Sequence, residues 1–252
     1  MTSPALRQWG LSPSRVDLRG AAGATRDSAP VELAASPQNL AADLARTAII
    51  VIDMQNDFCT PGGWLDSIGV DVSAATAAVA PINTLLPALR AAGVPVIWLN
   101  WGNRPDQANL PPGIRHVYDA DGSGGGIGDT VARSEAVLQE GSWGAAIVDE
   151  LDVAAGDIHV AKYRMSGFFD TPLDSILRQL RVDTILFAGV NADQCVLATL
   201  TDAACLGYDV VLVEQASATT SPAFCLDATV YNVRQCFGFT TTPTDLLAAL
   251  AA

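Results

Sequence analysis

Three side chains with chemical potential follow three separate apolar segments of the chain. Asp53 ends the run AIIVID, Lys162 follows DIHVA, and Cys195 comes shortly after TILFAGV. The carboxyl ends of parallel strands meet at one edge of an open α/β sheet, and such sheets bind ligands there. We therefore expect a carboxylate, an ammonium group and a thiol to converge on one rim of a sheet.

These residue types suit covalent acyl transfer. A thiol in the first turn of a helix faces oriented N–H groups, and a nearby ammonium adds positive charge. We therefore expect the pKa of Cys195 to lie below its free value of about 8.5. Asp53 can accept the thiol proton and return it to a leaving amine, while backbone N–H groups in the turn GVNADQC can stabilise an oxyanion. His159 within a strand and His116 in a long insertion suit the role of base poorly.

Lys162 is the only lysine among the 14 basic residues. Arginine cannot replace a compact ammonium with a shiftable pKa, so this position favours a functional role over that of a leftover surface lysine. Taken singly, a cysteine after a strand is often a core residue and an aspartate there a helix cap. The placement of all three at strand ends is what favours a site.

Alternating apolar and helical segments must position these side chains. Strands are predicted at 48–53, 94–100, 157–161, 184–190, 209–214 and 235–239. Helices are predicted at 72–92, 172–180, 193–206, 222–234 and 245–252. Several strand runs are continuously apolar, as expected of strands covered on both faces. The pattern predicts an α/β fold: a single doubly wound, Rossmann-like and mainly parallel sheet with helices on both faces.

Two segments fall outside this alternation. Residues 1–44 are rich in Ala, Ser, Gly, Pro and Arg with little periodicity, and we expect a loosely structured N-terminal arm before a single α/β domain at 45–252. Residues 103–141 form a long insertion with GSGGG at 122–126. Such a loop serves as a lid, a specificity loop or an oligomer contact.

The composition excludes several classes of partner. The chain has 252 residues, 50% of them hydrophobic, and a net charge of −13, which repels nucleic acid. No run of 18 apolar residues predicts a membrane span, and the start lacks the apolar core of a signal peptide, so we expect a cytoplasmic protein. Five cysteines without CxxC spacing indicate reduced thiols rather than a disulfide frame or a zinc site.

Three long stretches make the sequence resemble the isochorismatase-like cysteine hydrolase superfamily over roughly residues 45–250. They are AIIVIDMQNDFCTPGG (48–63), HVAKYRMSGFFDTPLDSILR (159–178) and ILFAGVNADQCVLATLTDAACLGYDVVLVEQASAT (185–219). The resemblance implies a triad in which Cys195 is the nucleophile, Asp53 the general acid/base and Lys162 the group that orients and stabilises charge.

The same resemblance implies a cis peptide bond between Val190 and Asn191, with the N–H groups of Asn191 and Cys195 as oxyanion donors. It also implies a homo-oligomer, dimer or tetramer, and a site that needs no metal or organic cofactor.

Local features narrow the choice within the superfamily. The metal-binding Asp-x-His motif of nicotinamidases is absent between Asp53 and His116, and members that hydrolyse isochorismate lack the cysteine. SGFFDTPLDSILR and GSWGAAIVDEL resemble ureidoacrylate amidohydrolases, whereas DFCTPGGWLDSIGVDVS, NRPDQANLP and GIGD resemble biuret-type hydrolases. Met165 stands where biuret-type enzymes place a second lysine, and Trp101 and Asn103 replace polar or charged groups.

We therefore expect cleavage of the C–N bond of a small linear urea, ureido or carbamoyl compound, such as biuret, triuret, guanylurea or ureidoacrylate. The reaction would pass through a thioester and release ammonia or an amine. The predicted pocket walls, each of which could equally serve core packing, are Phe58, Trp101, Asn103, Trp143, Tyr163 and Met165.

Other classes fit less well. A degenerate scaffold with a binding or regulatory role would not need an intact triad. Nicotinamidase and N-carbamoyl amino acid hydrolase activities stay as alternatives within the superfamily. A flavodoxin-like carrier needs a glycine-rich phosphate loop where this chain has DMQNDF, and a sulfur-redox enzyme needs a resolving cysteine that no CxxC motif supplies.

Overall fold

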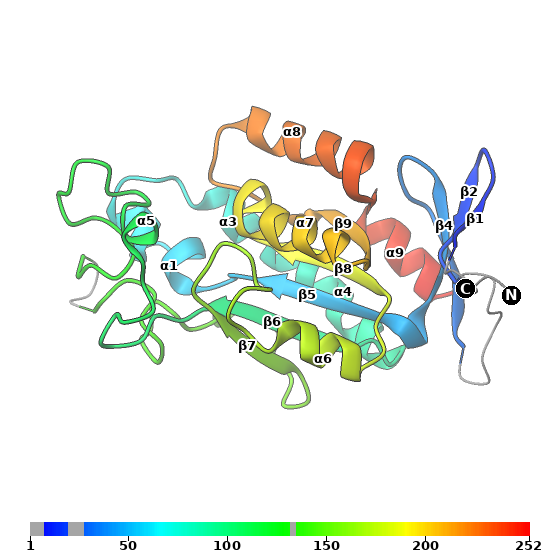
Figure 1. Ribbon diagram of the computed structural model, residues 1–252, viewed down its shortest axis with the longest axis horizontal. Helices are drawn as coiled ribbons and strands as arrows, with labels where there is room; N and C mark the ends of the chain where they lie inside the picture. The colour runs from blue at the N-terminus through cyan, green and yellow to red at the C-terminus, as the bar shows by residue number, and fades with distance from the viewer. Residues whose placement is uncertain (1–7, 20–27, 132–134) are drawn as a thin grey trace, which may run out of the picture.

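Six parallel strands form the centre of the protein. The computed structural model describes residues 8–19, 28–131 and 135–252. The strands are β5 (Thr47–Ile52), β6 (Val96–Trp101), β7 (Ile158–Lys162), β8 (Thr184–Gly189), β9 (Asp209–Ser217) and β10 (Phe239–Thr241). They pair in the order β10-β9-β8-β5-β6-β7 (Figure 1). The chain winds outward from β5 to one side and from β8 to the other, so the topological switch point lies between these two strands.

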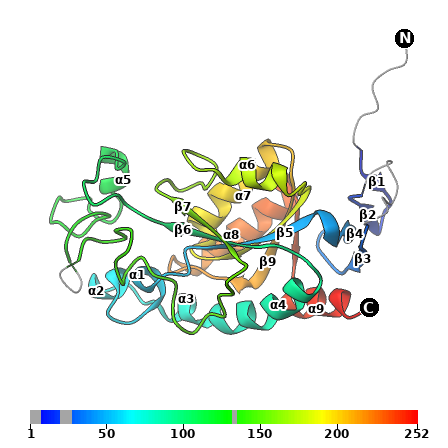
Figure 2. The ribbon, with the colours of Figure 1, turned by 90° about the horizontal axis from the view of Figure 1, so that it is seen from below.

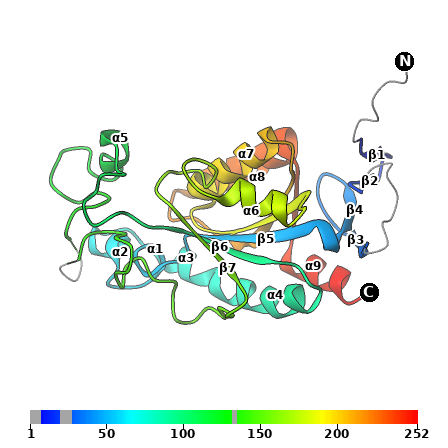
Figure 3. The same cartoon turned by 60° about the horizontal axis from the view of Figure 1, so that its bottom comes forward.

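Helices cover both faces of this sheet. They are α1 (Asn56–Cys59), α2 (Trp64–Ser67), α3 (Ser73–Ala77), α4 (Val79–Ala91), α5 (Pro112–Arg115), α6 (Leu173–Gln179), α7 (Leu197–Cys205), α8 (Ala223–Asn232) and α9 (Pro243–Leu250). α4 and α9 lie on one face, and α6, α7 and α8 lie on the other (Figures 2 and 3). The predicted doubly wound α/β fold is confirmed. None of the helices in the described part of the chain combines the length and apolar character needed to cross a bilayer.

Burial explains the continuous apolar runs in the sequence. Every residue of β5 and β8 is buried, because helices cover both sides of these central strands. Gly189 ends β8 with φ +110, and a Cβ added there would overlap the carbonyl oxygen of Ile52. Only glycine therefore allows β8 to approach the end of β5 so closely.

Several element boundaries differ from the prediction. The segment 72–92 divides into α3 and α4, and the segment 193–206 opens with a π-helical turn, Ala192–Val196. The predicted strand at 235–239 is wrong for its first residues, because a second π-helical turn, Val233–Phe237, continues α8. The strand begins only after Gly238, where the backbone runs against the carbonyl of Val210 and no Cβ fits.

The N-terminal segment contains more regular structure than the sequence indicates. Four short strands, β1 (Gly10–Leu11), β2 (Arg15–Asp17), β3 (Pro30–Leu33) and β4 (Asn39–Asp43), form a second sheet in the order β1-β2-β4-β3. Strands of two to five residues are too short to produce a periodic signal, which explains why a loose arm was expected. Residues 1–7 and 20–27 of the predicted arm lie outside the described residues.

This small sheet lies at the end of the molecule opposite the carboxyl ends of the parallel strands (Figure 1). Trp9 Nε1 donates to Asp209 Oδ1 at 2.9 Å, and Ser36 forms an antiparallel bridge with Thr240.

The insertion lies beyond the carboxyl ends of the parallel strands (Figure 1). Its described residues include one short helix, α5, and the side chains of Leu110, Ile127 and Leu138 are buried. The Trp64 indole of α2 donates to the carbonyl of Gly125 at 2.8 Å, so the insertion is anchored on the core.

Candidate active site

The three side chains singled out in the sequence meet at the carboxyl edge of the sheet. Lys162 Nζ lies 2.7 Å from Asp53 Oδ2 and donates to Cys195 Sγ at 3.3 Å. The side chains of Lys162 and Asp53 are 0% and 1% exposed, and Cys195 is 4% exposed. Asp53 follows β5, Lys162 ends β7, and Cys195 lies in the π-helical turn after β8.

The long side chain of Lys162 allows a residue at the end of β7 to contact Asp53, which follows β5 two strands away. The intervening strand β6 places Trp101 opposite Lys162 in register, and the ammonium lies 4.2 Å from the centre of the Trp101 ring. The aromatic face thus stabilises the cation where it crosses the middle strand. Nζ also donates to the carbonyl of Arg164 at 3.3 Å, which leaves the ammonium surrounded by acceptors.

Asp53 occupies the left-handed region with φ +50, at the point where the chain leaves β5. Its backbone N–H still donates to the carbonyl of Leu99, so β6 holds this residue in place. Among the residues that the structure describes, its carboxylate oxygens have the ion-paired ammonium of Lys162 but no hydrogen-bond donor of good geometry. A buried carboxylate with unused acceptor capacity is suited to take up a proton.

Burial and the facing charges together set the pKa values of Asp53 and Lys162. It raises the pKa of Asp53 above its usual range, although the charge of Lys162 opposes this shift. Burial lowers the pKa of Lys162, but the charges of Asp53 and Cys195 outweigh it, and the pKa ends above its ordinary value. Lys162 is therefore a charged ammonium at neutral pH, and it lies next to a carboxyl group that burial makes more basic than usual.

The expectation of a lowered thiol pKa is wrong. Burial raises the pKa of Cys195 to about 12. The positive charge of Lys162 opposes this rise and the carboxylate of Asp53 adds to it, but burial is the largest cause. The resting Cys195 side chain is therefore a neutral thiol. Such a thiol needs a base to become a nucleophile, and the carboxylate of Asp53 is a group that can accept its proton.

The turn between β8 and the nucleophile offers a backbone donor. The Val190–Asn191 bond is cis, as the resemblance implied. The N–H of Val190 donates to Ile52 and that of Ala192 donates to Ala218, whereas the N–H of Asn191 has no acceptor among the described residues. An unused backbone N–H close to the nucleophile is suited to stabilise an oxyanion.

The predicted pocket residues occupy different positions relative to the triad. Met165 Sδ lies 3.7 Å from Cys195 Sγ, which makes Met165 a direct neighbour of the nucleophile. The ring of Trp101 faces the ammonium group of Lys162. Asn103, 1% exposed, accepts from Trp101 Nε1 at 2.6 Å and donates to the carbonyl of Val137 at 2.8 Å. It orients Trp101 rather than presenting a free amide.

Phe58, Trp143 and Tyr163 contact residues outside the triad. The Phe58 ring packs edge-on against Trp64, and the carbonyl of Trp143 accepts from Asn56. Tyr163 donates its hydroxyl to the carbonyl of Asp170. These contacts join the three residues to surrounding loops and leave their role as pocket walls a prediction.

Gln55 and Asp57 are supporting residues that the sequence analysis did not single out. Gln55 accepts from the backbone N–H of Trp101 and donates to its carbonyl, both at 2.8 Å. Asp57 accepts from the N–H groups of Trp64 and Leu138, and its burial raises its pKa. The polar cluster within DMQNDF, directly after a buried strand, was the available signal.

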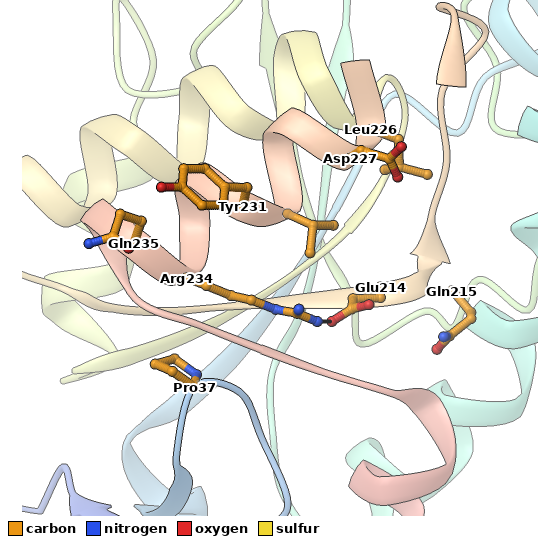
Figure 4. A pocket seen from close by; sticks show the side chains of 9 residues that line it. Pro37, Glu214, Gln215, Leu226, Asp227, Tyr231, Arg234 and Gln235 are labelled. Atoms are coloured by element: carbon orange, nitrogen blue, oxygen red, sulfur yellow. Dashed lines mark hydrogen bonds and ion pairs between the residues drawn. The ribbon is translucent and has the colours of Figure 1, made fainter. Parts of the chain in front are cut away.

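A separate groove lies apart from the predicted site residues. It encloses about 700 Å³ and is lined by Pro37, Glu214, Gln215, Leu226, Asp227, Val230, Tyr231, Arg234 and Gln235 (Figure 4). An ion pair between Arg234 and Glu214 crosses its floor, and none of the predicted site residues contributes to it. Within the described ranges, no three His, Cys, Asp or Glu side chains are grouped to hold a metal ion.

The sequence matches a known protein family and two curated relatives over most of its length. The Isochorismatase domain model matches residues 47–245. The ureidoacrylate amidohydrolase RutB of Rhizobium rhizogenes is 37% identical over 89% of this chain and 91% of its own length. The RutB of Agrobacterium fabrum is also 37% identical, over 87% of this chain and 96% of its own.

Solved structures share the fold over most of the chain. A cysteine hydrolase from Pseudomonas syringae pv. phaseolicola has a TM-score of 0.72 at 28% identity, covering 83% of this chain and 94% of its own. The N-carbamoylsarcosine amidase of Thermoplasma acidophilum has a TM-score of 0.60 at 28% identity, covering 79% and 96%. The chain belongs to the isochorismatase family.

Proposed function

We propose that this protein cleaves the C–N bond of a small linear urea, ureido or carbamoyl compound through a thioester on Cys195. Its family and its amidohydrolase relatives make it a hydrolase of amide C–N bonds. The observation that carries the covalent scheme is the buried cluster in which Lys162 contacts both Asp53 and Cys195.

Asp53 moves each proton in the proposed cycle. It takes the proton of the Cys195 thiol as sulfur attacks the substrate carbonyl carbon, and the oxyanion accepts from the N–H of Asn191. Asp53 then protonates the nitrogen as the C–N bond breaks, which leaves a thioester and releases ammonia or an amine. Water attacks the thioester carbonyl, loses a proton to Asp53, and the thiol leaves with that proton. The products are the acid and the amine.

Lys162 keeps the charge of this cluster balanced. When the thiol proton moves to Asp53, negative charge moves from the carboxylate to sulfur, and the ammonium contacts both atoms. Because the site is buried, the attraction to this fixed cation is stronger than it would be in water.

The substrate class is supported by the relatives and by Met165. Two relatives are ureidoacrylate amidohydrolases, and one structural neighbour is an N-carbamoylsarcosine amidase. Met165 gives the space beside the nucleophile an apolar wall, where a second lysine would favour an anionic group. A short neutral carbamoyl or ureido group fits this environment.

An ammonia-release screen tests this function. The panel comprises ureidoacrylate, biuret, triuret, guanylurea, nicotinamide and N-carbamoyl amino acids. Cys195→Ala should abolish release, while Cys205→Ala, at the exposed last residue of α7, should leave it unchanged. Acid quenching during turnover should trap an acyl adduct on Cys195, seen by mass spectrometry. Full turnover by Cys195→Ala would refute the covalent scheme, and exclusive use of nicotinamide would refute the substrate class.

We also propose that the chain forms a dimer or tetramer. Phe224 and Tyr231 of α8 are 69% and 65% exposed, which is unusual for large apolar side chains. Light scattering coupled to size-exclusion chromatography measures the mass. A monomer at micromolar concentration would contradict this proposal.

A further inference from the structure

The insertion contacts both flanks of the catalytic cluster. On one side, Gln194 Nε2 donates to the hydroxyl of Tyr118 at 3.3 Å, and Gln194 directly precedes the nucleophile. On the other side, Arg164 Nη1 donates to the carbonyl of Asn109 at 2.8 Å. The carbonyl of the same arginine accepts from Lys162. Two segments that carry catalytic groups are therefore fastened to one loop.

The ring of Tyr118 packs against a buried residue of the core. Its ring packs edge-on against Trp64, with centroids 5.5 Å apart and planes at 85°. Trp64 is fully buried, and its indole donates to Gly125 within the same insertion. The hydroxyl of Tyr118 thus has a defined position even though the residue is 41% exposed.

Gln194 connects three segments through its amide. Its Oε1 accepts from Asn191 Nδ2 at 3.4 Å, and its Nε2 donates to both Tyr118 and Ser221 Oγ, each at 3.3 Å. Asn191 Oδ1 in turn accepts from the backbone N–H of Thr220 at 3.1 Å. Asn191 is also the residue whose backbone N–H has no acceptor within the described part of the chain. The amide of Gln194 therefore helps to orient the side chain of Asn191, and the backbone N–H of Asn191 is the proposed oxyanion donor.

We propose that Gln194 is a positioning residue that fixes the oxyanion turn to Tyr118 of the insertion. The inference rests on the proposed amidohydrolase function. The proposal makes the insertion part of the active site. The position of the Asn191 N–H then depends on the hydrogen bond between Gln194 and Tyr118 of the insertion.

Steady-state kinetics test the coupling. Gln194→Leu keeps the size of the side chain but removes the amide, and we expect kcat to fall about tenfold while KM changes less than about twofold. Tyr118→Phe should lower kcat in the same way but less. The double variant should be no worse than Gln194→Leu alone, because both changes break one linkage. Unchanged kcat, additive losses or an effect confined to KM would overturn the proposal.

A matched control comes from the groove of Figure 4. Gln235→Leu makes the same chemical change on an exposed residue in a groove that no triad residue lines, and it should leave kcat unaltered. Alkylation of Cys195 by iodoacetamide separates two routes of action. This displacement forms no oxyanion, so Gln194→Leu should leave its rate within about twofold. An alkylation rate that falls as much as kcat would overturn the proposal.

Hydrogen exchange separates failure of this inference from failure of the proposed function. Loss of the Gln194 amide should speed backbone exchange in residues 116–126, whether or not a substrate is known. Unchanged exchange in Gln194→Leu would overturn the linkage. A wild-type chain that releases no ammonia, but shows the exchange effect, would overturn only the function.

Discussion

At the scale of single residues, the proposed mechanism shares one proton among buried groups. Cys195 is protonated at rest, so its thiolate forms only when the proton moves to an ionised Asp53. This scheme makes the ionised state of Asp53 a condition of activity.

The pH profile follows from the direction of the Asp53 shift. Asp53 accepts a proton only when ionised, and burial raises its pKa above the ordinary value of about 3.9. We expect kcat/KM to fall with decreasing pH through an apparent pKa clearly above 4, a value that belongs to the coupled cluster. A pH–rate profile measures it, and Asp53→Asn should be inactive at every pH. An acid limb at about pH 4 or below would contradict the role of burial.

The buried ion pair makes Lys162 a structural as well as a chemical residue. Lys162→Met leaves the Asp53 carboxylate buried without its cation, and we expect the free energy of unfolding to fall by about 3 kcal/mol. Adding Asp53→Asn should restore most of this loss, because no unpaired charge is left. Urea denaturation of the single and double variants measures both effects. A double variant as unstable as Lys162→Met would show that packing, not charge, dominates.

At the scale of elements, the strand ends and the wide turn after β8 place the nucleophile. The N–H of Val196 donates to the carbonyl of Asn191, five residues earlier. The N–H of Leu197 donates to the carbonyl of Ala192, also five residues earlier. Such π-helical turns recur at functional sites. Here the turn puts Cys195 close to Lys162, while α7 continues behind it.

Gly189 is the element-level position most sensitive to substitution. Gly189→Ala adds a Cβ that overlaps the Ile52 carbonyl at a φ of +110, and we expect a loss of about 3 kcal/mol of stability together with activity. Gly93 has φ +76 with open space around it, so Gly93→Ala should cost only about 1 kcal/mol. Chemical denaturation compares the two. Equal losses would mean that the strand ends can separate without penalty.

At the scale of the whole molecule, the N-terminal sheet and the site lie at opposite ends of the parallel strands (Figure 1). The small sheet is fastened to the larger unit by Trp9 and Ser36, and β3 packs beside α9. We therefore propose that both sheets unfold together even though only one carries the chemistry.

Leu40 tests this cooperativity. Its side chain is fully buried in β4, so Leu40→Ala should lower the free energy of unfolding by about 3 kcal/mol. Calorimetry should show one transition at a lower temperature, and kcat measured well below it should be unchanged. A separate early transition would instead make the N-terminal sheet an independent unit.

The sequence alone determined the fold class and the three residues that meet in the site. Continuous apolar runs predicted the central strands, because a strand that is buried on both faces has apolar residues at nearly every position. The chemistry of a carboxylate, a lone lysine and a cysteine at three strand ends was likewise a local signal. Short strands, as in the N-terminal sheet, leave too few residues for such a signal.

The tertiary structure alone decided the protonation of Cys195 and the place of the insertion. A pKa depends on how deeply a group is buried and on the charges facing it, and both come from segments distant in the chain. The roles of Gln55, Asn103 and Gln194 depend in the same way on partners 46, 34 and 76 positions away in sequence. Such contacts leave no pattern in the local sequence, because distances across the chain are set only when the whole core has packed.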